Sequence, residues 1–173
     1  MSNIDLILLG LIKQKPQSAY DIKKNIEYRN ISKWVKISEQ SIYKKVLQLE
    51  GKKYISSHKV KDGNMPDKAI YTITEKGEAY FKKLMNEISN VDVNIFLDFN
   101  TIIVNLDLID DEQKCTIIAN IKTKIIEKKQ LLEEKYLQRE HIPDVGKAIF
   151  RQQIALINSL EDWIIDFEKN LNK

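Results

Sequence analysis

Apolar stripes and polar breaks alternate along the first half of the chain, and their spacing predicts helices joined by short links. Residues 4–12 are apolar on nearly every side, which indicates a buried helix. Pro16 ends this helix, because proline disfavours helical geometry in the residue before it. Ser18 can cap a second helix over residues 19–28, which carries isoleucines one turn apart on its inner face and two outward-pointing lysines, Lys23 and Lys24.

A third helix is predicted to begin at Ser38 or Gln40 and to end near residue 50. Its core stripe is Ile42, Val46 and Leu49, at positions i, i+4 and i+7. The opposite side is polar and carries Gln40, Ser41, Lys44, Lys45 and Gln48, with Tyr43 at the edge between the two faces. Such a face can approach phosphates and base edges, but it also suits an ordinary solvated helix. This helix alone therefore leaves both interpretations open.

A basic β-hairpin is predicted after this helix. Residues 54–61 and 69–73 are β-prone, and Asp62-Gly63-Asn64 between them favours a tight turn. The lysines near the tip are Lys59, Lys61 and Lys68. Thr74 is a good N-cap for a fourth helix. A helix followed by a basic hairpin is the order in which a winged helix-turn-helix approaches a nucleic-acid duplex, and it favours DNA binding over the solvated-face interpretation.

Charge is distributed unevenly between the two halves. Residues 1–85 hold 17 Lys and Arg against 9 Asp and Glu, a balance of +8, whereas residues 86–173 hold 11 against 16, a balance of −5. A basic first half attracts polyanions. We therefore expect a winged-helix DNA-binding domain at residues 1–88 and a helical domain at residues 89–173.

The second half is predicted to be helical. Residues 91–109 fit either the alternation of a strand or a helical stripe, and their length favours a helix. Acidic residues at 110–112 begin a long helix that ends near Arg139, and a last helix spans about Val145 to Leu171. The apolar band of this last helix is wider than one partner helix would cover, which favours dimerisation over a self-contained hairpin. The predicted dimerisation residues are Ile149, Phe150, Leu156, Ile157, Leu160, Trp163, Ile164 and Phe167.

The sequence offers no pattern typical of an enzyme. His58 and His141 lie far apart without cysteines or glutamates at ligand spacing, so we expect no metal and no cofactor. No apolar run approaches the roughly 20 residues of a membrane span, so no membrane association is expected. Cys115 is the single cysteine, which favours a reducing, cytoplasmic setting.

Segments of the first half resemble the PadR family of bacterial transcriptional regulators. The matching segments are LILLGLI, SAYDIKKNI, SEQSIYKKVLQLE, KKYI and PDKAIYTITEKG. The resemblance implies a winged helix with a two-stranded wing, C-terminal dimerisation helices, and repression through palindromic operator DNA. It places Ser41, Tyr43 and Lys44 at the DNA. The chain departs from the family where Lys53 replaces a glycine that is usual before the Tyr54-Ile55 pair.

We therefore expect a mainly α-helical, homodimeric regulator bound to double-stranded DNA in the bacterial cytoplasm and nucleoid. A winged helix that only associates with other proteins is the alternative. The predicted DNA-binding residues are Tyr20, Lys23, Ser38, Gln40, Ser41, Tyr43, Lys44, Lys45, Lys59, Lys61, Asn64 and Lys68. Some members of the family bind flat aromatic compounds or respond to phenolic acids, which makes Phe96, Phe99 and Trp163 candidates for binding a small aromatic effector. Aromatic residues at helical spacing are, however, more often plain core.

Overall fold

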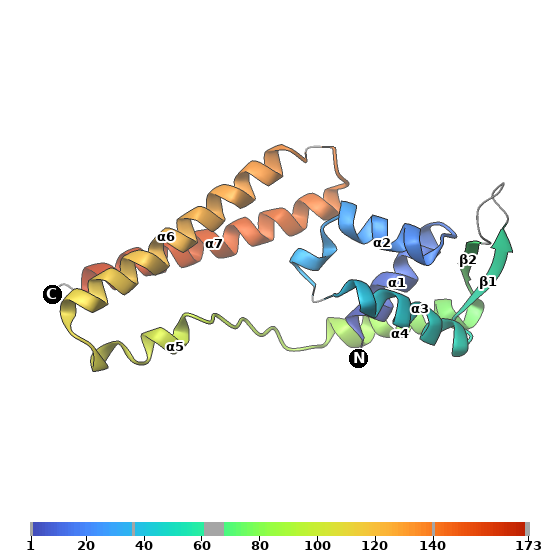
Figure 1. Ribbon diagram of the computed structural model, residues 1–173, viewed down its shortest axis with the longest axis horizontal. Helices are drawn as coiled ribbons and strands as arrows, with labels where there is room; N and C mark the ends of the chain where they lie inside the picture. The colour runs from blue at the N-terminus through green and yellow to red at the C-terminus, as the bar shows by residue number, and fades with distance from the viewer. Residues whose placement is uncertain (1, 36, 61–67, 140, 172–173) are drawn as a thin grey trace. The chain divides into compact units, whose positions relative to one another are not determined.

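The chain is mainly α-helical, with one two-stranded sheet (Figure 1). The computed structural model describes residues 2–35, 37–60, 68–139 and 141–171. The chain divides into two compact units, which we call unit 1 (Met1–Asn94) and unit 2 (Ile95–Lys173). Each unit has its own hydrophobic core. The predicted fold class, a winged helix followed by an all-α region, is confirmed.

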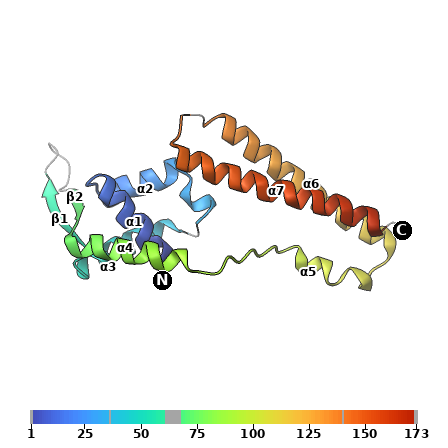
Figure 2. The ribbon, with the colours of Figure 1, turned by 180° about the vertical axis from the view of Figure 1, so that it is seen from behind.

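Unit 1 combines a helical core with a hairpin at one edge (Figure 2). Its elements are α1 (Asn3–Gln14), α2 (Ala19–Tyr28), the short 3₁₀ helix η1 (Ile31–Lys33), α3 (Glu39–Gly51), β1 (Ile55–Val60), β2 (Lys68–Ile73) and α4 (Glu75–Ser89). β1 and β2 pair antiparallel, with Ile55 opposite Ile73 and Val60 opposite Lys68. The predicted helices and strands of this unit are confirmed, while the predicted turn between the strands lies outside the described residues.

Side-chain caps fix where all four α-helices of unit 1 begin, with Ser2 accepting the backbone N–H of Asp5 at α1. At α2, Ser18 accepts the backbone N–H of Asp21, and the Asp21 carboxylate accepts the backbone N–H of Ser18. Ser38 and Ser41 form the same reciprocal pair at α3, and Thr74 accepts a backbone N–H in the first turn of α4. A cap satisfies amides that have no partner inside the helix and contributes about 1 kcal/mol. The predicted caps at Ser18, Ser38 and Thr74 are confirmed.

The core of unit 1 gathers the apolar stripes of its four helices and of β1. Its most deeply buried side chains are Leu8, Leu9, Ile12, Ile22, Ile42, Val46, Leu49, Ile55 and Leu84, each at most 2% exposed. Burying one such side chain stabilises the fold by about 1.5–3 kcal/mol. The stripe predicted for α3 is thus fully used inside the protein, and the opposite side of that helix remains available to solvent.

The link from α3 to β1 passes through a residue in the left-handed region. Lys53 has a φ of 61°. Its N–H donates to the carbonyl oxygen of Glu50, while the N–H of Tyr54 donates to that of Leu49. A residue with a side chain pays about 1–2 kcal/mol to adopt this conformation, whereas glycine adopts it freely. Lys53 is therefore strained, and it stands at the position where the resemblance to the PadR family implies a glycine.

Lys53→Gly is expected to stabilise unit 1 by up to about 1 kcal/mol, since the relief of strain exceeds the greater flexibility of glycine in the unfolded chain. Urea unfolding followed by circular dichroism would measure the change. Lys52→Gly is the matched control, because Lys52 has an ordinary φ of −83° and should lose stability. If Lys53→Gly were no more stable than Lys52→Gly, the assignment of strain to Lys53 would be wrong.

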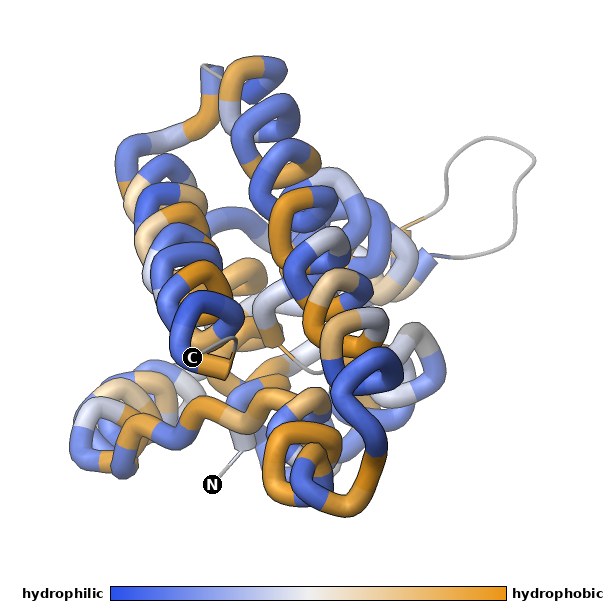
Figure 3. The backbone as a smooth tube through the Cα atoms, turned by 90° about the vertical axis from the view of Figure 1, so that its left-hand side faces the viewer, coloured by the Kyte–Doolittle hydropathy of each residue, from blue (hydrophilic) through white to orange (hydrophobic). Residues whose placement is uncertain are grey.

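Unit 2 is built around a long helical hairpin. Its elements are α5 (Asn100–Ile103), the 3₁₀ helix η2 (Leu106–Leu108), α6 (Asp111–Leu137) and α7 (Asp144–Leu171). α6 and α7 lie side by side and antiparallel (Figures 1 and 2), joined by ion pairs from Lys122 to Glu168 and from Lys129 to Glu161, each 2.6 Å. Apolar and polar residues alternate along both helices (Figure 3), and the buried isoleucines, with Leu132, form the core of the hairpin. Both predicted long helices are confirmed.

Among the described residues, no helix combines the length and the hydropathy that a bilayer crossing requires.

The helix predicted over residues 91–109 is wrong. The described residues 91–99 form neither helix nor strand, and only the short elements α5 and η2 follow. Asp92, Asn94 and Asp98 interrupt the apolar residues, and such short polar side chains favour turns and caps over helix interiors. The amide group of Asn94 donates to the carbonyl oxygen of Asp92, and the carbonyl oxygen of Asp98 accepts the hydroxyl of Thr101. Both are bonds from a side chain to nearby backbone, and residues 92–97 form neither helix nor turn.

Candidate nucleic-acid interface

α3 exposes a polar face that also carries two apolar side chains. Gln40, Lys44 and Gln48 are exposed on the side opposite the buried stripe. Tyr43 and Leu47, one turn apart, are 43% and 63% exposed. The open face predicted from the spacing is therefore present. Leu47 was missed, although its position outside the core stripe and one turn after Tyr43 could have indicated it.

The hydroxyl groups of Ser38 and Ser41 hold the first turn of α3 in place. Ser41 donates to the Ser38 carbonyl oxygen and accepts the Ser38 backbone N–H at 3.1 Å. Ser38 in turn accepts the backbone N–H of Ser41 at 3.3 Å. Both residues thus fix the direction in which the exposed face of α3 points.

Lys45 connects α3 to the buried carboxylate of Asp5. Its Nζ lies 3.2 Å from Asp5 Oδ1, and the Asp5 side chain on α1 is only 7% exposed. The Tyr80 hydroxyl donates to the other Asp5 oxygen at 3.4 Å. A buried carboxylate needs such partners, because removing it from water is costly. The helical spacing placed Lys45 on the open face with Lys44, and this placement is wrong, since its ammonium group faces α1.

Lys45→Ala is therefore expected to destabilise unit 1 by about 1–3 kcal/mol, because it leaves Asp5 buried without its cation. The loss falls below that of a fully buried pair, since the Lys45 side chain is 30% exposed. Urea unfolding would measure it. Lys44→Ala removes the same charge from the exposed face and should stay within about 0.5 kcal/mol of the wild type. Equal unfolding midpoints for the two variants would contradict this role of Lys45.

The first turns of α2 present one aromatic and one basic side chain. Tyr20 is 54% exposed, and the Nζ of Lys24 lies 5.5 Å from the centre of its ring. Such a cation–π pair holds both side chains in one orientation. The outward direction predicted for Lys24 is confirmed. Lys23, also predicted to point outward, is half-buried and pairs with Glu27 at 3.6 Å.

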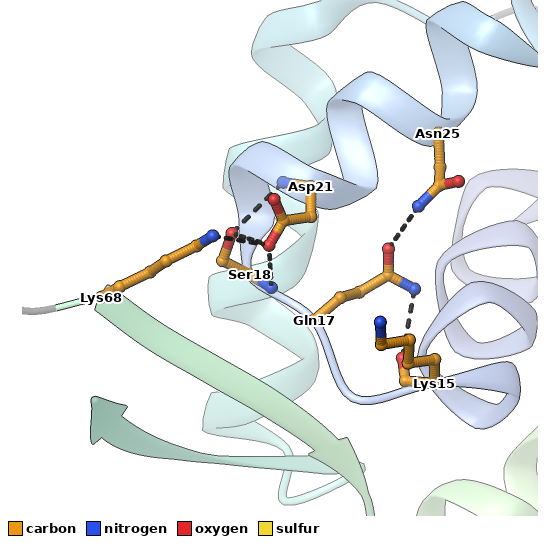
Figure 4. Close-up of polar contacts among 6 residues, drawn as sticks. All are labelled: Lys15, Gln17, Ser18, Asp21, Asn25 and Lys68. Atoms are coloured by element: carbon orange, nitrogen blue, oxygen red, sulfur yellow. Dashed lines mark hydrogen bonds and ion pairs between the residues drawn. The ribbon is translucent and has the colours of Figure 1, made fainter. Parts of the chain in front are cut away.

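Within the described strands of the hairpin, one lysine is exposed and one is paired. Lys59 on β1 is exposed. Lys68 on β2 reaches back to α2, where its Nζ lies 2.8 Å from Asp21 Oδ2 (Figure 4). Partial burial acts to raise the pKa of Asp21, but hydrogen bonds from Lys68 and from the hydroxyl and backbone of Ser18 outweigh it and lower that pKa. Lys68 thus joins the hairpin to the N-terminus of α2. The other two predicted hairpin residues, Lys61 and Asn64, lie outside the described residues.

A second connection between the hairpin and α2 runs through Gln17. Its backbone pairs with that of Tyr71 on β2 through two hydrogen bonds of 3.2 and 3.0 Å. Its side-chain amide donates to the carbonyl oxygens of Leu11 and Lys15 and accepts from Asn25 at 2.8 Å (Figure 4). The buried Gln17 therefore connects α1, α2 and β2, so that the helices and the hairpin form one framework.

Lys68→Met is expected to reduce the stability of unit 1 by a few tenths of a kcal/mol near neutral pH, since the pair is partly exposed to solvent. A carboxyl whose folded pKa lies below its unfolded value stabilises the fold above the unfolded value, and the contribution disappears as the pH falls through the folded pKa. The ordinary value for Asp21 is 3.8. Urea unfolding should therefore show a constant difference from wild type down to about pH 5 and none in stronger acid. Lys59→Met is the control and should show no such loss at any pH.

The predicted dimerisation residues of α7 fall into two groups. Ile157 and Ile164 are buried in the α6–α7 core, and the Phe150 ring contacts that of Tyr136 at 6.0 Å. The others keep part of their surface open: Leu156 is 45% exposed, and Ile149, Leu160, Trp163 and Phe167 are half-buried. Leu160, Trp163 and Phe167 also pack against the α6–α7 core. The broad apolar band thus serves the hairpin, and the partly open surfaces of Ile149, Leu156, Leu160, Trp163 and Phe167 form an apolar strip along α7.

Three aromatic rings form a stacked row in unit 2. Trp163 lies between Phe99 and Phe167, with centroid separations of 5.5 and 5.4 Å and interplanar angles of 17° and 18°. The predicted effector-binding residues Phe99 and Trp163 are therefore brought together. Phe96 is 89% exposed and does not stack with them. Phe167, which was predicted only for dimerisation, completes the row.

Comparisons with known proteins agree with this geometry. Residues 8–83 match the family model of the transcriptional regulator PadR-like family. No curated protein sequence matches the chain. The fold is similar to that of Bacillus subtilis PadR in complex with operator DNA, with a TM-score of 0.81 and 15% sequence identity over 99% of this chain and 98% of that chain. It is also similar to that of Bacillus subtilis PadR in complex with p-coumaric acid, with a TM-score of 0.83 and 14% identity over 98% of this chain and 99% of that chain. It is also similar to a PadR-like transcriptional regulator from Bacillus cereus (0.70, 24%, 98% of each chain).

Proposed function

Because the chain belongs through residues 8–83 to the PadR-like family of transcriptional regulators, we propose that it binds a palindromic operator as a homodimer and represses transcription. The activity of this family is regulation of transcription, so the chain is not an enzyme, as the sequence predicted. The proposal places the protein in the bacterial cytoplasm, on its operator.

The exposed face of α3 carries this proposal. Gln40, Lys44 and Gln48 follow one another at four-residue intervals, so they share one side of the helix. Glutamine can pair with adenine and lysine with guanine in the major groove, which is wide enough to admit a helix. Lys59 on the adjacent hairpin adds positive charge for the phosphate backbone. Bacillus subtilis PadR, which has a similar fold, has been solved in complex with operator DNA, and this supports DNA binding by the present chain.

The dimer follows from the symmetry of the proposed operator. Two reading helices that enter successive major grooves must lie about 34–36 Å apart, and a two-fold axis between them requires a palindrome. We assign the contact between copies to the open apolar strip of α7. Its residues are Ile149, Leu156, Leu160, Trp163 and Phe167. In this assignment Phe150, Ile157 and Ile164 act indirectly, by holding α7 against α6.

Duplex binding measured against salt concentration tests the proposal. A DNA reader should lose affinity steeply with rising salt, with roughly one unit of slope in log K against log salt for each phosphate neutralised. Selection from a random duplex pool should then yield a palindrome. A winged helix that only associates with other proteins would bind no duplex even at low salt, and that result would replace the present proposal.

The stacked row in unit 2 supports a second proposal, that a flat aromatic acid binds against one end of the row, where Trp163 is one ring away, and weakens operator binding. A row of nearly parallel rings can extend by one more aromatic ring, and Bacillus subtilis PadR has been solved with p-coumaric acid. The Trp34→Phe variant leaves Trp163 as the single tryptophan. Its fluorescence should then respond saturably to p-coumaric acid, and Phe99→Ala should weaken the response. An unchanged spectrum and unchanged operator affinity would reject this ligand.

A further inference from the structure

Leu47 exposes an aliphatic side chain on the mainly polar face of α3, one turn from Tyr43. Among the described leucine and isoleucine side chains of unit 1, it alone is exposed, at 63%. The core does not use it, because Ile42, Val46 and Leu49 already form the buried stripe of α3. Folding of unit 1 therefore gives no reason for a leucine at this position.

The neighbours of Leu47 are side chains suited to base edges. Residues three and four apart are adjacent on a helix surface, so Leu47 lies beside Tyr43 and Lys44. It follows Gln40 by seven residues, which corresponds to about 10 Å along α3, or roughly three base-pair steps. If Gln40 and Lys44 face the major groove, Leu47 faces it as well, at a different base pair.

The chemistry of leucine limits what it can recognise there. Its side chain can neither donate nor accept a hydrogen bond. In the major groove, the apolar feature of a base edge is the C5-methyl group of thymine, which distinguishes it from the other bases. A protein partner fits this surface less well, because a docking patch requires a large contiguous apolar area. The exposed apolar side chains of α3 are only Tyr43 and Leu47, and Lys44 and Gln48 flank Leu47 on the same helix.

On the basis of the proposed function, we infer that Leu47 contacts a thymine methyl group in each half-site of the operator and so helps to determine its sequence. Leu47 is a specificity-determining residue in this account, distinct from the residues that supply hydrogen bonds or charge. Burial of one methyl group corresponds to roughly a fourfold change in affinity. The operator should therefore contain a thymine about three base pairs from the base that Gln40 reads.

Replacement of thymine by deoxyuridine tests this inference, because it removes only the methyl group. A duplex selected from a random pool would be synthesised with each thymine replaced in turn. Dissociation constants would be measured for the full-length wild-type protein, for Leu47→Ala, and for Leu47→Met, which keeps an apolar side chain. Met85→Ala is the matched control, since Met85 is 53% exposed on α4. Thermal unfolding of each variant would confirm that it folds.

We expect one thymine per half-site at which deoxyuridine weakens wild-type binding by roughly fourfold, or more when both half-sites are replaced. Leu47→Ala should bind the normal duplex more weakly and be insensitive to replacement at that thymine, whereas Leu47→Met and Met85→Ala should remain sensitive. Equal sensitivity in wild type and Leu47→Ala, or no sensitive thymine at all, would overturn the inference and leave the proposed function standing. Failure to bind any duplex would overturn the proposed function itself.

Discussion

Gly77→Ala is expected to destabilise unit 1 by about 3 kcal/mol or more, the largest effect on stability that we anticipate from a single methyl group. Gly77 lies in the first turn of α4, packed against the chain at the start of β1. A Cβ at this position would collide with the carbonyl oxygen of Tyr54 and lie 2.9 Å from Cγ1 of Ile73. Backbone on one side and a core side chain on the other leave no room to relax. The helix preference for alanine over glycine, about 1 kcal/mol, is too small to compensate.

Thermal unfolding in a Trp163→Phe background would measure this effect, because the remaining tryptophan, Trp34, then reports on unit 1. Gly51→Ala is the matched control. It also lies in a helix, but a Cβ added there meets no atom within 4 Å. Its stability should equal or slightly exceed that of the wild type. If Gly77→Ala unfolded at the same temperature as Gly51→Ala, the packing of α4 against the start of β1 would be wrong.

The double variant Gln40→Ala, Lys44→Ala is expected to lose at least about 100-fold in operator affinity, since each good base contact contributes about 1–3 kcal/mol. Both side chains are exposed and play no part in the core, so stability should remain within about 0.5 kcal/mol of the wild type. The loss of affinity would therefore report on recognition rather than folding. Gel-shift titration of the selected operator would measure it.

Lys128→Ala controls for the change in charge, because Lys128 is an exposed lysine on α6 in unit 2. It should leave operator affinity almost unchanged. The single Lys44→Ala variant adds a further distinction: if Lys44 contacts phosphate, the salt slope falls by about one unit, whereas a base contact leaves the slope nearly unchanged. Unchanged affinity in the double variant would reject α3 as the reading helix.

Two lysines that the sequence suggested for DNA contact hold the reading surface in place. Lys45 attaches α3 to Asp5 on α1, and Lys68 attaches β2 to Asp21 on α2. Each bond joins an element of the proposed interface to the body of unit 1. A surface fixed before binding loses less conformational entropy when it meets DNA. In the proposed function, these lysines would therefore act indirectly, by positioning α3 and the hairpin.

The features that sequence reasoning predicted correctly are those that depend on local chemistry. The caps at Ser18, Ser38 and Thr74 satisfy amides only a few residues away. The buried stripe of α3 follows directly from helical periodicity. The hairpin follows from two β-prone runs. Each of these features joins residues that are near one another in the sequence, the most distant being the hairpin pair Ile55 and Ile73.

The features that were missed depend on residues far apart in the sequence. No spacing rule connects Lys45 with Asp5 or Lys68 with Asp21, and a lysine in a helical pattern is assigned to the surface by default. The helix predicted through residues 91–99 was wrong for another reason. Its apolar residues satisfied the helical pattern, but short polar residues such as Asp92 and Asn94 recur among them, and such side chains disfavour helix interiors.

In the proposed complex, two copies of the chain place α3 in successive major grooves of one palindrome. Binding to the selected operator, to the same operator with five base pairs inserted at its centre, and to a single half-site would test it most directly. We expect two chains on the intact operator and a loss of at least about 100-fold in affinity on the other two duplexes, because five base pairs turn the half-sites to opposite sides of the helix. One chain per duplex, with equal affinity for the half-site and the full operator, would contradict the account.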